Sequence, residues 1–344
     1  MIQYFSKIFR FFSFLFLLTM FFNRCSDNPS APLNQNYSAS FNKLWNDFDR
    51  HYSYFVYKNI DWDRLKSKYQ PYVQENTNYG YFIWTIKTML SELHDLHISI
   101  ITMDGNFIKP YYKLVSKNYD YNILYSGKYF IRSIAHSVNG NILYGDVADS
   151  IGYVLIKSWR NAYKSDINGF GNILDKYKNY KALIMDVRPN NGGSELLAQQ
   201  VAGRFTTGTK IYAYDKSRNG PQHSDFTEMK ARSFSPTGSW QFTKPVALLI
   251  GNVCMSSNEA FILMMSTLDN VITIGDTTRG SSGNPKEYML VDGTKYFIPR
   301  WVAYKSDKTV LEDVGIFPDV PIKSSESIIN KRDKALDKAI EVME

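Results

Sequence analysis

Residues 245–259 read Pro-Val-Ala-Leu-Leu-Ile-Gly-Asn-Val-Cys-Met-Ser-Ser-Asn-Glu. The apolar run 246–250 predicts a buried strand, and residues 257–268 predict the helix that follows it. Ser256 then stands at the start of the helix, where free backbone N–H groups, such as that of Ser257, can hold an oxyanion. This makes Ser256 a candidate nucleophile. The simpler alternative is a capping box, in which Ser256 and Glu259 only satisfy backbone groups of the helix.

The second half of the chain continues this alternation of strands and helices. It predicts an α/β domain over residues 151–325, with a mostly parallel sheet that is buried on both faces. A C-terminal helix is expected in residues 326–344. Residues 208–239 are expected to form a long loop over the cleft in which a ligand would bind. The predicted strands are 152–156, 182–187, 246–250, 271–274 and 296–301, and the predicted helices are 166–177, 195–205 and 257–268.

The first half divides into a helical part and a strand-like part. Between residues 37 and 96 apolar side chains recur at steps of three and four, which predicts an N-terminal domain of three amphipathic helices. Asp61 and Thr77 are candidate helix caps. From 97 to 150 the pattern becomes strand-like, and Ser126-Gly127 predicts the turn of a hairpin. We therefore expect a β-rich connecting segment between the helical domain and the α/β domain.

The first residues resemble an export signal. Lys7 and Arg10 precede an apolar run at 11–22, and Cys25 follows it. This pattern is typical of a bacterial lipoprotein signal peptide over residues 1–25, with Cys25 as the lipidated residue and 26–36 as a tether. Simple secretion and an uncleaved anchor are the alternatives, and each of the three places the domain outside the cytoplasm.

The composition argues against several classes of function. The chain has 344 residues, of which 44% are hydrophobic and 21% charged, as in ordinary globular proteins. Its net charge of +7 is mild and its basic residues are scattered, so no nucleic-acid partner is expected. His94-x-x-His97 has metal-like spacing, but no further ligands cluster with it, so neither a metal nor a cofactor is expected. The sequence does not fix the oligomeric state.

Other residue patterns could serve the chemistry of Ser256. The pair Gly192-Gly193, between a predicted strand and a helix, lets backbone N–H groups approach a ligand, although a tight connection is the simpler reading. His97, after a helix, is a candidate general base or a packed histidine. Glu312 lies in an acidic loop. Cys254 is a rival nucleophile, but its position favours a buried thiol.

Five segments together resemble the tail-specific, or C-terminal processing, serine peptidases and the core of tricorn protease. The resemblance spans about residues 41–322, and the segments follow the family's order. They are Leu93-His-Asp-Leu-His97, Asp186-Val-Arg-Pro-Asn-Asn-Gly-Gly193, Ser256-Ser-Asn-Glu259, Gly275-Asp-Thr-Thr-Arg-Gly280 and Glu312-Asp-Val-Gly-Ile-Phe-Pro-Asp319. The resemblance implies a crotonase/ClpP-like β-α superhelix for the catalytic domain.

The chain departs from the processing peptidases at their general base. Where that branch has a lysine, this chain has Ser281. The tricorn-like branch uses a histidine and a glutamate, and His97 and Glu312 stand at those positions. Leu96 replaces the serine that precedes the histidine of tricorn protease. Residues 104–149 lack the pattern of a PDZ domain, so recognition of substrate tails is not implied.

The resemblance therefore implies a serine endopeptidase that acts on polypeptides outside the cytoplasm. Ser256 is then the nucleophile, His97 its base and Glu312 the residue that orients the relay. Backbone N–H groups of the glycine pair and of Ser257 hold the oxyanion. Two alternatives stay open: a non-catalytic cell-surface module of the same fold that binds an apolar or peptide ligand, as retinoid-binding modules do, and an enoyl-hydratase-like acyl enzyme.

Overall fold

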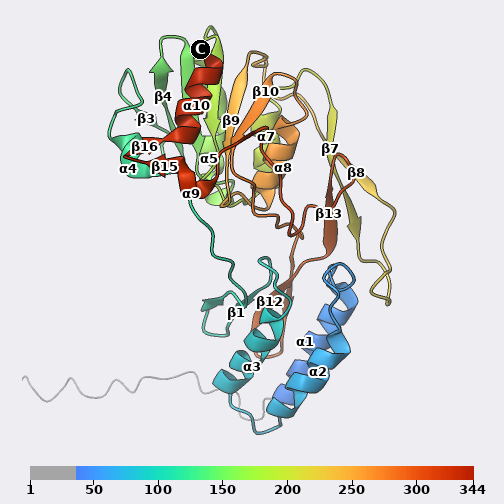
Figure 1. The fold of residues 1–344 in the computed structure, drawn as a ribbon. Helices are drawn as coiled ribbons and strands as arrows, with labels where there is room; N and C mark the ends of the chain where they lie inside the picture. Colours follow the sequence, from blue (N-terminus) through green and yellow to red (C-terminus); the bar gives the residue numbers. More distant parts are fainter. Residues whose placement is uncertain (1–35) are drawn as a thin grey trace, which may run out of the picture.

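The structure is a computed structural model that describes residues 36–344. A seven-stranded sheet forms its largest part (Figure 1). The five strands at one side of this sheet run parallel, and the two at the other side are antiparallel. In spatial order they are β14 (Val320–Pro321), β10 (Val271–Gly275), β9 (Val246–Ile250), β6 (Ala182–Asp186), β5 (Ile151–Ile156), β4 (Ile142–Ala148) and β3 (Ala135–His136).

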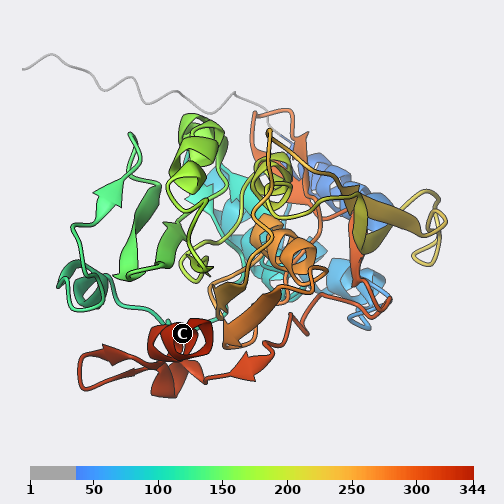
Figure 2. The same ribbon diagram turned by 90° about the horizontal axis from the view of Figure 1, so that it is seen from above.

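Helices cover both faces of this sheet, as Figure 2 shows from above. The central strands β5, β6 and β9 are buried along their whole length, which matches their continuous apolar sequences. One face packs against α5 (Lys164–Asn168), α6 (Phe170–Asp175), α7 (Glu195–Ala202) and α8 (Ser257–Met265). The other packs against α4 (Tyr121–Tyr125) and α10 (Lys334–Met343). The predicted α/β architecture is therefore confirmed.

Three N-terminal helices share one core with a small sheet, which combines two strands that follow these helices with two strands from residues 286–298. We call this unit the N-terminal part. The helices are α1 (Tyr37–His51), α2 (Trp62–Tyr69) and α3 (Tyr79–Ser91), with the short helix η1 (Gln70–Tyr72) after α2. The antiparallel sheet has the order β11 (Lys286–Met289), β12 (Lys295–Ile298), β1 (Ser99–Ile101) and β2 (Phe107–Ile108). Asp61 caps α2 as predicted, whereas the cap of α3 is Asn78 and not Thr77.

A third sheet stands between these two parts. It has the order β13 (Trp301–Lys305), β7 (Lys210–Ser217) and β8 (Lys230–Phe234). The expected long loop at 208–239 is therefore wrong, because β7 and β8 pair as a hairpin inside it. The strand expected at 296–301 is also split into β12 and β13. Pro299 lies at the break, where a residue without a backbone N–H does not continue the ladder.

The segment 97–150 differs from the expected β-rich connection. Its strands β1 and β2 belong to the N-terminal sheet, while β3 and β4 extend the seven-stranded sheet. The hairpin expected over 121–132 is wrong, because 121–125 form α4. Asp120 caps this helix by accepting from the N–H of Asn122, and the adjacent Ile123 and Leu124 are both buried. Two buried neighbours suit one side of a helix better than a strand with one solvated face.

The remaining elements are short. A 3₁₀ helix, η2 (Asn161–Tyr163), precedes α5, and α9 (Ser324–Ser327) and the hairpin of β15 (Ile328–Ile329) and β16 (Arg332–Asp333) precede α10. None of the helices in 36–344 is long and apolar enough to cross a membrane. The predicted signal peptide 1–25, its Cys25 and all but the last residue of the tether 26–36 lie outside the described residues.

Candidate active site

Ser256 immediately precedes the first turn of α8 and has a strained backbone. Its φ of 58° and ψ of −130° lie outside the regions that a residue with a side chain ordinarily adopts. Its N–H donates to the carbonyl oxygen of Ser281 at 2.9 Å and to Oε2 of Glu259 at 3.1 Å. Since strained residues are concentrated at functional sites, this geometry supports Ser256 as a functional residue.

The carboxylate of Glu259 organises the surroundings of Ser256. It is fully buried, and besides the N–H of Ser256 it accepts from the N–H groups of Ser281 (3.0 Å) and Gly280 (2.8 Å) and from the hydroxyl of Thr278 (2.5 Å). Burial raises the pKa of Glu259 to about 7. From the sequence, Glu259 was expected only to cap the helix. The Thr-x-Gly pair of the family motif, which supplies two of the donors, was the signal for the larger role.

His97 reaches the site from the N-terminal part of the chain, between α3 and β1. Its ring Nδ1 lies 2.9 Å from the hydroxyl oxygen of Ser281, and its backbone N–H donates to Asp95 at 2.7 Å. The Nζ of Lys109 donates to the carbonyl of Leu96 at 2.7 Å. Burial, and then the charge of Lys109, lower the pKa of His97 to about 3, so the imidazole is neutral at neutral pH.

Ser281 therefore contacts both predicted catalytic residues. Its carbonyl oxygen accepts from the N–H of Ser256, and its hydroxyl is hydrogen-bonded to His97. Ser281 is fully buried, whereas Ser256 is half-buried and lines a pocket. Within residues 36–344 no hydrogen bond joins Ser256 to His97 directly. The structure thus links the two residues through Ser281.

Glu312 lies behind this arrangement. Its Oε2 accepts from the N–H of Ser282 at 2.9 Å, and its Oε1 is 3.3 Å from Nζ of Lys58. Lys58 also pairs with Asp313 at 2.8 Å. Burial and the nearby Asp95 raise the pKa of Glu312 well above its ordinary value. Glu312 thus connects the residue after Ser281 to Lys58 in the N-terminal part of the chain.

The two glycines after β6 lie against the start of α8. Gly192 has φ of 102°, and a Cβ on it would lie 2.9 Å from Cβ of Ser256. Gly193 has φ of 141° and leaves no room for a Cβ beside Trp159. The N–H of Gly192 donates to Oδ1 of Asn190 at 2.9 Å and is therefore committed. Of the two predicted glycine donors, only Gly193 remains a candidate.

Two further predictions concern residues near this site. Cys254 is fully buried, its Sγ lies 3.3 Å from the carbonyl of Val187, and burial raises the pKa of its thiol far above the ordinary value. This agrees with a packed thiol. His94 and His97 do not form part of any group of three or more histidine, cysteine or carboxylate side chains that could hold a metal, as far as residues 36–344 are concerned.

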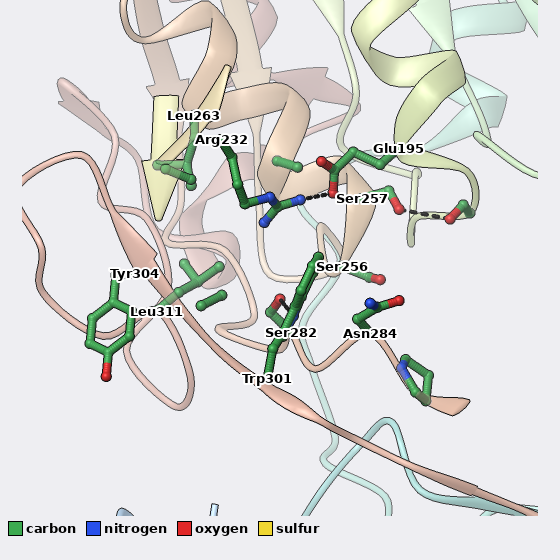
Figure 3. A pocket seen from close by; sticks show the side chains of 15 residues that line it. Glu195, Arg232, Ser256, Ser257, Leu263, Ser282, Asn284, Trp301, Tyr304 and Leu311 are labelled. Carbon is green, nitrogen blue, oxygen red and sulfur yellow. Dashed lines mark hydrogen bonds and ion pairs between the residues drawn. The ribbon is translucent and has the colours of Figure 1, made fainter. Parts of the chain in front are cut away.

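A pocket of about 310 Å³ opens beside Ser256 (Figure 3). The start of α8 and Gly193 form one part of its wall, and the three-stranded sheet forms another. The lining residues that are labelled in the figure are Glu195, Arg232, Ser256, Ser257, Leu263, Ser282, Asn284, Trp301, Tyr304 and Leu311. A strained serine thus lines a pocket beyond the carboxyl end of β9, and the buried Ser281 connects this serine to a neutral histidine.

Comparison with known proteins shows to which family the chain belongs. The family model described as "Peptidase family S41" matches residues 150–322, which is half of the chain. The chain belongs to peptidase family S41. The description "Tricorn protease C1 domain" also matches residues 33–91. These matches confirm the predicted resemblance, and they leave no ground for the enoyl-hydratase-like alternative. No curated protein matched the chain.

Solved S41-like structures support the same fold. A candidate peptidase from Parabacteroides merdae is 27% identical, with a TM-score of 0.78, and the alignment covers 90% of this chain and 97% of that one. Mature CPAF is 11% identical, with a TM-score of 0.63 and coverage of 90% and 96%. Tricorn protease is 16% identical, with a TM-score of 0.59 and coverage of 90% and 36%. The last two comparisons show a shared fold alone.

Proposed function

We propose that this S41 member is a serine endopeptidase with Ser256 as nucleophile and His97 as general base. The observation that carries the proposal is the position of Ser281, which holds the main chain of Ser256 and the ring of His97 at once. The neutral state of His97 also supports it, because only an unprotonated imidazole can accept the proton of a serine.

In this proposal His97 carries its proton on Nδ1 and uses Nε2 as the base. When Nδ1–H of His97 donates to the hydroxyl oxygen of Ser281, Nε2 carries no proton and can take the one from Ser256. The serine oxygen then attacks the peptide carbonyl, and the imidazolium returns the proton to the leaving amine. In the second half of the reaction His97 takes a proton from water, the water oxygen attacks the acyl carbon, and the imidazolium returns the proton to the departing oxygen of Ser256. A positioned base of this kind contributes about 100- to 10,000-fold to the rate.

Backbone N–H groups at the start of α8 can stabilise the negative charge that develops on the carbonyl oxygen of the substrate in the transition state. We assign the oxyanion to the N–H of Ser257, in the first turn of the helix, and to that of Gly193, which also lines the pocket. Loss of one such donor costs about 100- to 1,000-fold in turnover. Glu312 has a positioning role in this proposal, because its carboxyl group accepts from Ser282 N–H next to Ser281.

The proposal is tested by digestion of an unfolded polypeptide with three forms of the protein. Wild-type protein should cleave it, and Ser256→Ala should lose at least about 1,000-fold in turnover while keeping its melting temperature. Ser266→Ala is the matched control, since Ser266 is exposed at the far end of the same helix. Equal cleavage by wild type and Ser256→Ala would exclude Ser256 as the nucleophile.

We place the enzyme outside the cytoplasm, held to a membrane through a lipid on Cys25. The support is the charged and apolar pattern of residues 1–25. Metabolic labelling with a radioactive fatty acid tests the anchor: the wild-type chain should incorporate label, and Cys25→Ser should not. Label that persists in Cys25→Ser would contradict lipidation at this residue.

The second candidate function is a non-catalytic binding module of the same fold. One observation favours it, namely that Ser256 and His97 share no hydrogen bond. Catalytic hydrogen bonds are often completed only when substrate binds, so the lack of this hydrogen bond is also compatible with an enzyme. Covalent labelling of Ser256, described below, separates the two functions.

A further inference from the structure

The pocket beside Ser256 combines apolar walls with one buried pair of opposite charges. Leu263, Leu311 and Trp301 supply apolar surface. Arg232 and Glu195 form an ion pair within the pocket, and their side chains are only 12% and 24% exposed. Figure 3 shows the two charged groups pointing toward each other, close to Ser256 and Ser257. A substrate group that enters this pocket therefore contacts an arginine whose charge is offset by that of Glu195.

Arg232 is fixed in place by aromatic rings as well as by its partner. Its guanidinium carbon lies 4.4 Å from the ring centre of Trp301 and 5.3 Å from that of Tyr212. The hydroxyl of Tyr212 also donates to Glu195, which leaves each carboxylate oxygen of Glu195 with one donor. Stacking holds the plane of a guanidinium but leaves the N–H groups in that plane available.

Hydrogen-bond donors outnumber acceptors at this ion pair. One nitrogen of Arg232, Nη2, donates to Glu195. The Nε lies 4.0 Å from Asp215, which is too long for a hydrogen bond, and Nη1 has no protein acceptor among residues 36–344. An apolar side chain that displaced water from Arg232 would leave these N–H groups unpaired, which is costly in a buried site.

We propose that this pocket selects an uncharged substrate side chain that ends in a carbonyl oxygen, next to the scissile bond. In peptides this is the carboxamide of glutamine or asparagine. Lysine and arginine side chains carry only hydrogen-bond donors, so they cannot pair with the free N–H groups of Arg232. A glutamate side chain would compete with Glu195 for the same guanidinium and add charge beside Asp215. The proposal rests on the peptidase function assigned above and adds the chemistry of its substrate.

The double variant Glu195→Gln/Arg232→Met is the matched test. It removes both charges of the ion pair and keeps an oxygen acceptor for Tyr212, and Lys230 remains near Asp215 as a counter-charge. Wild type and double variant digest the same peptide library, and mass spectrometry identifies the residues beside each cut. In wild type, glutamine should exceed methionine by about tenfold at one of the two positions, as expected for one charge-assisted hydrogen bond. In the double variant this preference should disappear or reverse.

A binding experiment separates this proposal from the proposed function. Ser256→Ala protein, with either the native pair or the double substitution, is titrated by NMR with short peptides that carry glutamine, methionine, glutamate or lysine. Tighter binding of the glutamine peptide only when Arg232 is present supports the pocket, even if wild type cleaves nothing. Equal binding of the glutamine and methionine peptides, or a preference for lysine, overturns it. Unchanged cut sites in the double variant overturn it as well.

Discussion

The hydroxyl oxygen of Ser281 lies 2.9 Å from Nδ1 of His97. The motif resemblance predicts Ser281 at the position of the lysine in the processing peptidases, and Ser281 belongs to a turn that Glu259 holds against Ser256. In the proposed mechanism this residue no longer supplies the base but supports it. The serine that precedes the histidine in tricorn protease is replaced by Leu96, and Ser281 offers a hydroxyl from another loop.

Replacement of Ser281 by alanine should lower kcat about 10- to 100-fold, because the imidazole loses the partner that fixes its orientation and tautomer. KM should change little, since the fully buried Ser281 cannot touch substrate. Steady-state kinetics on Ser281→Ala and on the exposed-serine control Ser266→Ala measure the difference. An unchanged kcat in Ser281→Ala would show that the hydrogen bond to His97 is not used.

The activity should rise with pH around pH 7 because of Glu259. Its pKa of about 7 means that the carboxyl is half protonated there, and only the carboxylate can accept from all four of its donors. Raising the pH through 7 therefore ionises Glu259, and the carboxylate can then accept the hydrogen bond from the N–H of Ser256 together with the other three. His97 cannot cause this rise, since its pKa is about 3.

The profile of kcat/KM against pH tests this assignment. Wild type should show an acidic limb with a midpoint near 7. Glu259→Gln should be slower at every pH and should lack that limb, because its side chain does not titrate. A limb that survives in Glu259→Gln would assign it to another group.

Much of the fold was predictable because its signals are local. The buried runs at 182–186 and 246–250 allowed only central strands, and the caps and apolar periodicity located the three N-terminal helices. The hairpin expected at 121–132 failed because Asp120 and a buried Ile-Leu pair favour a helix there. The strands at 210–217 and 230–234 were missed because no buried run marks them.

The site was predictable as a set of residues but not as a network. The family motifs named Ser256 and His97, yet their link through Ser281 depends on a contact between residues 184 positions apart. The commitment of the Gly192 N–H to Asn190 likewise depends on the local loop conformation. Sequence patterns carry no information on such geometry when one hydroxyl or one N–H could have several partners.

Gly192→Ala should destabilise the protein by about 1–3 kcal/mol and lower its turnover. The new Cβ requires an unfavourable φ and would lie 2.9 Å from both Cβ of Ser256 and the carbonyl oxygen of Met255, so it displaces the nucleophile. Gly208→Ala is the control, because no atom lies within 4 Å of its Cβ position. Urea unfolding of both variants measures the effect. Equal stabilities would contradict the close approach at Gly192.

Glu312→Gln and Glu312→Leu should differ in stability. Glutamine keeps an oxygen acceptor for the N–H of Ser282, whereas leucine leaves that buried N–H and part of the contacts of Lys58 without a partner. The leucine variant should therefore be less stable than the glutamine variant by about 1–3 kcal/mol, and slower in turnover. Similar unfolding free energies for the two variants would remove the positioning role from Glu312.

The most direct test of the central claim is labelling with a fluorophosphonate, followed by mass spectrometry of the modified peptide. The account predicts a single adduct on Ser256 in the wild-type protein, and labelling at least about 100-fold slower in His97→Gln, because the base is lost. An adduct on Ser281, an unlabelled Ser256 or a rate unaffected by His97→Gln would contradict it.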